Sequence, residues 1–203
     1  MTDSYRTITA PTSARITRKK SRFAAFLCPA RSPEDIDREL ARLRKAHHDA
    51  HHVCFAYRIH GDPVPSSAAD DAGEPAGSAG VPILHRLENA NLVDLLAVVV
   101  RHFGGAKLGV GGLVRAYGDA AQKALDEAQI VVRKIEVEVE IIFPTELTSP
   151  VMRAIHRCGA TAGRIEYDAQ ARALVTLPPS RVDGFLGELR DATGARARAE
   201  VKA

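Results

Sequence analysis

The chain has 203 residues, of which 45% are hydrophobic and 26% charged, and its formal net charge is +3. This composition is typical of a globular protein and excludes wholesale disorder. No apolar run reaches the roughly 18 residues that a membrane helix needs. The N-terminus lacks a basic segment followed by an apolar stretch, so we expect no secretory signal. Three cysteines without CxxC spacing favour reduced thiols in a cytoplasmic protein.

The first part of the chain mixes strand and helix patterns. Residues 13–28 alternate as one or two strands, and Ser32 followed by Pro33 predicts the start of a helix, because serine caps the first turn and proline fits the first helical position. Residues 61–80 have no apolar periodicity, and a loop of this length is usually functional or disordered. Further strands are expected at 53–60 and 92–100, with helices from Pro82 and over 113–128.

The second part has a different pattern. Apolar and acidic residues alternate over 137–141, which predicts a half-buried strand. The elements expected after it are a helix around 147–155 ended by Gly159, strands at 161–167 and 171–177, a helix around 182–189 and a strand at 196–201. This βαββαβ order is the ferredoxin-like arrangement. We therefore predict an α+β protein with two domains, residues 1–134 and 135–203.

The positive charge lies in the first of these domains. Residues 1–134 hold 19 Lys and Arg against 15 Asp and Glu, whereas residues 135–203 hold 9 against 10. A polyanion would therefore be expected to meet the first domain. The densest basic cluster, which is either a polyanion contact or a solvated strand edge that deters aggregation, consists of Arg15, Arg18, Lys19, Lys20 and Arg22.

A glycine-rich turn precedes the helix over 113–128. Free amides at a helix N-terminus attract anions, and glycine lets the backbone approach a ligand. Lys107 and Arg115 would add charge. Neither the P-loop nor the dinucleotide fingerprint is matched, so phosphate contact and simple packing of helix on strand both stay open. The glycines are Gly104, Gly105, Gly109, Gly111 and Gly112.

Two other clusters contain groups that bind metals. One cluster has three acids that would suit a hard cation, namely Asp70, Asp71 and Glu74. Their spacing does not match that of an EF-hand, and the alternative interpretation is that they are solvated side chains of a loop. Four histidines in residues 47–52 lack the further ligands that a zinc site needs. His52 and Cys54 would face the same side of a strand, either as a nucleophile pair or as a buried thiol beside a hydrogen-bonded imidazole. We predict no metal and no cofactor.

Four segments together resemble the IMPACT/YigZ family (uncharacterised protein family 0029): residues 20–23, 52–57, 70–84 and 98–117. The match spans about residues 13–128, and His102 stands where the family usually has an aromatic residue. The resemblance implies a ribosomal-protein-S-five-domain-2-like βα domain followed by a ferredoxin-like domain. That pair is similar to domains IV and V of elongation factor G, which touch the ribosome.

The resemblance also implies a role in translation, since eukaryotic relatives compete for a ribosome-associated activator of a stress kinase. The family has no established catalytic residues. The leading hypothesis is therefore non-catalytic binding of RNA or the ribosome; the alternatives are a small-molecule enzyme acting on a nucleotide or phosphorylated ligand with magnesium, and a protein-partner adaptor. The candidate binding residues are Arg18, Lys19, Lys20, Arg22, Asp70, Asp71, Glu74, Arg101, Gly104, Gly105, Lys107, Gly109, Gly111, Gly112 and Arg115.

Residues 67–84 and 103–117, here called the two family segments, are expected to form one surface. Both connect to strands and could lie at the same end of one sheet. The acids of the first segment would then lie near Lys107 and Arg115 of the second, which offsets repulsion between like charges within each segment.

Overall fold

A computed structural model describes residues 2–61 and 64–202. Two compact units divide these residues: one is 5–133, and the other joins the residues before Tyr5 to those from Lys134 onward. The pattern of the sequence predicts that the first domain begins at residue 1. The earliest residues instead group with the second unit because the Asp3 carbonyl accepts from Ile135 N–H at 2.9 Å and the Asp3 carboxylate from Ser180 N–H at 3.0 Å.

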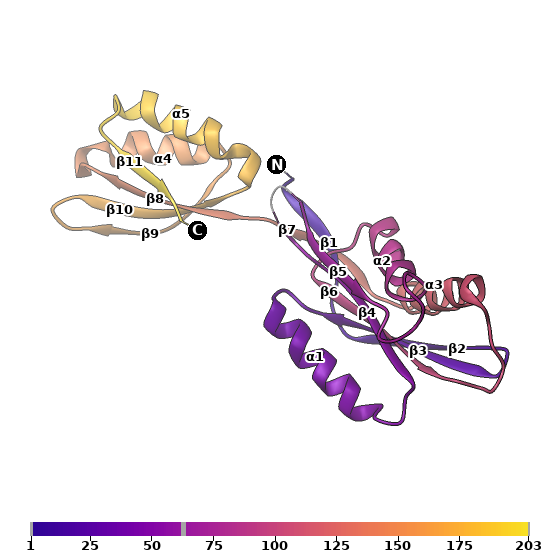
Figure 1. Ribbon diagram of the computed structural model, residues 1–203. Helices are drawn as coiled ribbons and strands as arrows, with labels where there is room; N and C mark the ends of the chain where they lie inside the picture. The colour runs from indigo at the N-terminus through magenta and orange to yellow at the C-terminus, as the bar shows by residue number, and fades with distance from the viewer. Residues whose placement is uncertain (1, 62–63, 203) are drawn as a thin grey trace. The chain divides into compact units, whose positions relative to one another are not determined.

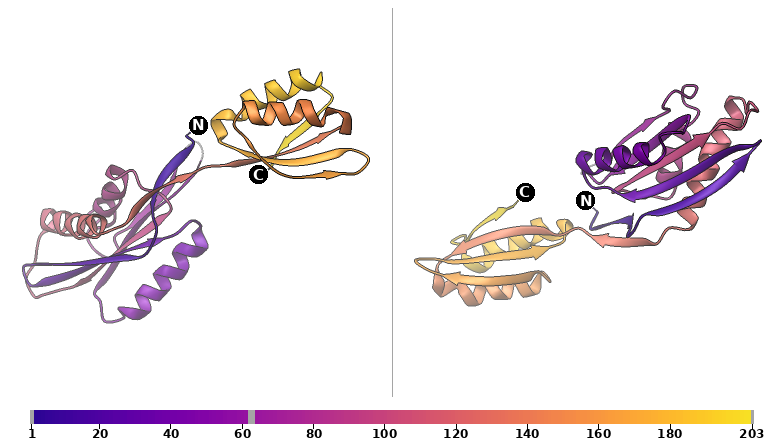
Figure 2. Two further views of the ribbon diagram at one scale, coloured as in Figure 1. Left: turned by 180° about the vertical axis from the view of Figure 1, so that it is seen from behind. Right: turned by 90° about the horizontal axis from the view of Figure 1, so that it is seen from below.

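The first unit contains a five-stranded antiparallel sheet in the order β2-β3-β6-β4-β5 and a two-stranded sheet of β1 and β7. Helix α1 covers one face of the larger sheet, and α2 and α3 cover the other (Figure 1, Figure 2). The elements are β1 (Ser4–Ile8), β2 (Thr12–Arg18), β3 (Ser21–Pro29), α1 (Pro33–Ala46), β4 (His52–Ile59), β5 (Ser66–Asp70), α2 (Gly80–Asn89), β6 (Leu95–His102), α3 (Val110–Asp126) and β7 (Ile130–Lys134).

The central strand β6 belongs to two hydrophobic cores. Leu95, Ala97 and Val99 pack in the core under α2 and α3, whereas the residues between them pack in the core under α1. Burial on both faces explains why this strand is a continuous apolar run. The same alternation directs Arg101 to the α2/α3 face and His102 to the α1 face.

The second unit has one four-stranded antiparallel sheet in the order β11-β8-β10-β9. A single described core includes residues of this sheet and of both helices. The chain order is β-α-β-β-α-β, with two short 3-10 turns. The elements are β8 (Val137–Phe143), η1 (Thr145–Leu147), α4 (Thr148–Arg157), β9 (Thr161–Tyr167), β10 (Ala171–Leu177), η2 (Pro179–Arg181), α5 (Val182–Thr193) and β11 (Arg198–Val201).

Three strands were not predicted from the sequence. β5 lies inside the loop that was expected over residues 61–80, of which residues 62 and 63 are outside the described residues. β1 and β7 lack a clear alternation of apolar and polar residues. Every residue of β5 is exposed, so the strand is held by backbone pairing with β4 and leaves no apolar pattern. Helix α2 also begins at Gly80, two residues before the predicted start. None of the helices in the described ranges is long and apolar enough to cross a membrane.

Candidate functional site

Glu74 and Arg101 form a buried ion pair. Arg101 Nη1 donates to Glu74 Oε1 at 2.6 Å, and the two side chains are 6% and 3% exposed. The Tyr117 hydroxyl donates to the same carboxylate oxygen at 2.7 Å. Burial is the main cause that raises the pKa of Tyr117 above its ordinary value, so the hydroxyl keeps its proton and remains a donor.

The two family segments therefore meet, as expected, since Glu74 belongs to the first and Tyr117 to the second. The cation that pairs with Glu74 is neither Lys107 nor Arg115, which were expected. It is Arg101, which precedes the second family segment. Arg115 is exposed on α3. Lys107 lines a pocket with Glu74 but is not among its ion-pair partners in the described chain.

The register of the sheet positions Arg101. It pairs with Phe23 on β3 and with His52 on β4, and directly paired residues point to the same face. The guanidinium carbon lies 5.6 Å from the Phe23 ring centroid and 5.4 Å from that of Phe103. These distances permit cation–π attraction, which favours a fixed guanidinium.

His52 and Cys54 are not arranged as a nucleophile pair. His52 Nδ1 donates to the Ala72 carbonyl at 3.0 Å, and the Cys54 thiol lies 3.0 Å from the Asp71 carbonyl and 3.4 Å from the Tyr117 hydroxyl. Burial raises the pKa of Cys54 to about 12, so the thiol stays protonated. Both side chains instead tie the first family segment to β4. The interpretation of a buried thiol is the correct one.

Asp71 anchors the start of α2. Its carboxylate accepts from the backbone N–H groups of Gly77 at 2.7 Å and of Ala79 and Gly80 at 2.8 Å each. Burial opposes ionisation, but these three donors outweigh it and hold the pKa of Asp71 below its ordinary value. The interpretation of Asp71 as a solvated loop acid is therefore wrong, and magnesium binding stays an alternative hypothesis. Asp70 accepts from Ala72 N–H at 2.6 Å.

We expect Asp71→Asn to lower the free energy of unfolding by about 1–3 kcal/mol at pH 7, because both carboxylate oxygens accept from backbone N–H groups and an amide nitrogen at either place leaves a donor unpaired. The folded-state pKa is depressed, so the stabilisation by the carboxylate is fully present above its unfolded pKa of about 4 and is lost as the pH falls from there through the lower folded-state pKa. Urea denaturation at several pH values should show the wild type approaching the variant in acid. A constant difference down to pH 3 would contradict the capping role.

The glycine turn combines packing with a special backbone conformation. A side chain on Gly104 would clash with the backbone of Lys20, and Gly104 N–H donates to Ser21 Oγ at 3.2 Å. Gly105 and Gly109 have φ values of +88° and +72°, which favour glycine. Gly104 therefore packs against the turn between β2 and β3, rather than holding helix on strand as the packing interpretation had it. Phosphate contact at the helix start stays a prediction.

The basic cluster is divided by the β2–β3 hairpin. Arg18 pairs with Asp119 of α3 at 3.2 Å, with both side chains well exposed. Lys19 and Lys20 form the turn, with φ values of 44° and 68°. Positive φ at both central residues is the geometry whose twist matches the flanking strands. The two lysines therefore lie at the tip of the hairpin.

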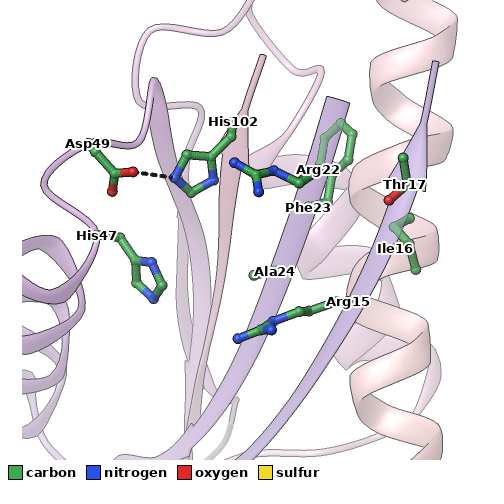
Figure 3. Close-up of a pocket in the computed structure, with 9 residues that line it drawn as sticks. All are labelled: Arg15, Ile16, Thr17, Arg22, Phe23, Ala24, His47, Asp49 and His102. Carbon is green, nitrogen blue, oxygen red and sulfur yellow. Dashed lines mark ion pairs between the residues drawn. The ribbon is translucent and has the colours of Figure 1, made fainter. Parts of the chain in front are cut away.

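Arg22 and Arg15 lie on the α1 face of the sheet and line a pocket of about 360 Å³ with His47, Asp49 and His102 (Figure 3). His102 Nε2 lies 3.3 Å from an Asp49 carboxylate oxygen. Burial, then the charges of His102 and Arg15, lower the pKa of His47. Asp49 is the one acid that lines this pocket among the described residues. We call Arg15, Arg22, His47 and His102 the basic pocket.

The described part of the chain holds no group of three or more metal-ligating side chains. Sequence reasoning missed the role of Tyr117, although a tyrosine within the apolar stripe of a helix signals a buried hydroxyl that needs a partner. It also missed the basic pocket, because Arg15, Arg22 and the histidines come from three separate segments. The register of β2, β3 and β6 brings Arg15, Arg22 and His102 together, and His47 joins them from the end of α1.

Comparison with known proteins identifies the family. A model of the Impact N-terminal domain matches residues 19–125. IMPACT family member YvyE of Bacillus subtilis (strain 168) is 40% identical over 135 residues, which are 66% of this chain and 62% of that protein. IMPACT family member YigZ of Escherichia coli (strain K12) is 33% identical over 175 residues, 85% of each chain.

One solved structure, described as that of a hypothetical protein, resembles almost the whole chain. It has a TM-score of 0.70 and 29% identity, and the alignment covers 98% of this chain and 97% of the other. The two-domain α+β fold is therefore shared with a solved protein. The domain match and the relatives together show that the chain belongs to the IMPACT family.

Proposed function

We propose that the protein is a non-catalytic, translation-linked accessory protein of the cytoplasm that binds RNA or the ribosome through the basic pocket of its first domain. The family resemblance supports the link to translation. We also propose that the two domains are of the ribosomal-protein-S-five-domain-2-like and ferredoxin-like types, like domains IV and V of elongation factor G. The candidate partners are RNA, the ribosome or a protein of the translation apparatus.

The observation that carries the proposal is the pair of arginines in the basic pocket. Arg15 and Arg22 are exposed, and neither forms an ion pair with another residue in the described ranges. Guanidinium groups bind phosphate oxygens through two parallel hydrogen bonds. Two unneutralised arginines in one hollow therefore favour a phosphate ligand over a solvated surface.

The surroundings extend the positive surface along the hairpin. Lys19 and Lys20 form the hairpin turn, and Arg22 follows Lys20 by two residues. His47 and His102 line the pocket beside the two arginines. No base-reading motif accompanies these residues. Contacts of this kind position a nucleic acid by its backbone, so binding should follow shape and charge rather than sequence.

The double variant Arg15→Ala/Arg22→Ala should bind a short single-stranded RNA more weakly and with a shallower salt dependence. Two lost phosphate contacts lower the slope of log affinity against log salt by about 1.4. Fluorescence anisotropy at several salt concentrations measures the slope. Arg153→Ala, at an exposed arginine of α4, is the control and should leave it unchanged.

An unchanged slope in the double variant would contradict the proposed site. A partner that remains bound after nuclease treatment and at high salt would contradict RNA as the ligand. That result would indicate a protein partner instead.

A further inference from the structure

A second pocket, of about 430 Å³, lies on the α2/α3 face of the same sheet, where the two family segments meet. Its lining includes Glu74, Arg101, Phe103, Lys107, Val110 and Leu113. Its volume is within the range of small-molecule sites. It is separate from the basic pocket, because neighbouring residues of β6, Arg101 and His102, point to opposite faces.

One end of this pocket is positively charged. It is the start of α3, where the N-cap is Gly109, whose lack of a side chain leaves the first amides without a side-chain cap. Leu113 N–H donates to the Gly109 carbonyl, which is the first acceptor of the helix. The N–H groups of residues 110–112 therefore have no acceptor within the helix. No acid lies in that turn, and Lys107 lies just before it. This end therefore favours an anion.

The floor of the pocket holds one buried polar atom that has no hydrogen-bond partner among the described residues. The Glu74 side chain is 3% exposed, and its Oε1 takes both hydrogen bonds, from Arg101 and Tyr117. Arg101 Nε is the atom without a partner, and its N–H group is a donor. Leaving a buried donor unpaired is costly, so a ligand with an acceptor oxygen or nitrogen would stabilise the floor.

The walls are apolar and include an aromatic ring. Leu108, Val110 and Leu113 line one side, and Phe103, which is 41% exposed, lines the rim. A ligand that fits has an anionic group, a hydrogen-bond acceptor for Arg101 and a flat or apolar body. We propose that this pocket binds a nucleotide, with the phosphate at the start of α3, an acceptor atom of the base facing Arg101 and the ring system against Phe103. The proposal concerns binding and does not depend on RNA binding at the basic pocket.

The sharpest test is Val110→Asp with Val110→Asn as its matched control. Val110 is 56% exposed, and an acid in the first helical turn favours the helix, so neither variant should unfold the protein. The carboxylate would repel a phosphate at the helix start, whereas the amide of similar size would not. Calorimetric titration of the wild type with the four ribonucleoside monophosphates should detect binding of at least one. Its affinity for Val110→Asp should be about tenfold or more below its affinity for Val110→Asn, because both variants lose the apolar contact and only the carboxylate repels the phosphate.

Three results would overturn the proposal. The first is that no monophosphate binds, and the second is that the two variants have equal affinities. The third is that Val110→Asp weakens the binding of an RNA oligonucleotide but not that of a monophosphate. The last would make the pocket part of an RNA surface. Inorganic phosphate alone should bind more weakly than the nucleotide; equal affinity would exclude a contribution of the base. Arg15→Ala/Arg22→Ala should keep nucleotide affinity, so failure at one site is distinguishable from failure at the other.

Discussion

Arg101→Met should lower the free energy of unfolding of the first domain by about 3–5 kcal/mol, because it leaves the carboxylate of Glu74 buried without a counter-charge. Methionine keeps the length and much of the apolar volume of arginine, so the loss reports mainly on the charge. Urea denaturation followed by circular dichroism measures it. The exposed pair Arg38–Asp35 has the same 2.6 Å separation and provides the control, since Arg38→Met should cost less than about 1 kcal/mol.

A double-mutant cycle with Glu74→Gln separates the ion pair from general packing. The neutral amide can still accept from Tyr117, and Arg101→Met/Glu74→Gln leaves no buried charge. The double variant should therefore be less destabilised than the sum of the single variants, by about 2 kcal/mol. Additive losses would contradict the view that the two residues act as one buried pair.

Charge reversal in the basic pocket should have the largest effect on binding. Arg15→Glu/Arg22→Glu removes two cations and adds two anions, so the affinity for single-stranded RNA should fall at least about 100-fold at about 0.1 M salt. Both side chains are exposed, and the fold should be retained, which circular dichroism can verify.

The matched control is Arg153→Glu/Arg164→Glu, at two exposed arginines of the second unit. This variant changes the net charge by the same amount, so it measures the general effect of net charge on RNA binding. Equal losses in the two double variants would show that binding depends on net charge and would contradict the basic pocket as the site.

The regular elements with strong local signals could be predicted from the sequence. Ser32 and Pro33 marked the start of α1, and Ser32 indeed accepts from Asp35 N–H at 3.3 Å. The alternation over 137–141 marked β8. β5 could not be predicted because its five residues are exposed and its backbone pairing with β4 depends on the folded sheet.

The sites were only partly predictable, for the same reason. Glu74 and Arg101 were candidates, and the two family segments were expected to meet, but no local pattern encodes a hydrogen bond across 43 residues such as that from Tyr117 to Glu74. Asp71 was considered as a metal ligand because sequence spacing does not reveal backbone donors. His102 joined the basic pocket only through its register opposite Arg22.

Co-sedimentation with ribosomes tests the central claim most directly. The wild type should pellet with ribosomes at about 50 mM salt and be released by about 300 mM, since contacts with phosphates weaken steeply with salt. Arg15→Glu/Arg22→Glu should stay in the supernatant at both concentrations, while Arg153→Glu/Arg164→Glu should pellet like the wild type. A wild-type chain that stays in the supernatant at low salt, or a basic-pocket variant that pellets with the wild type, would contradict binding to the ribosome through the basic pocket.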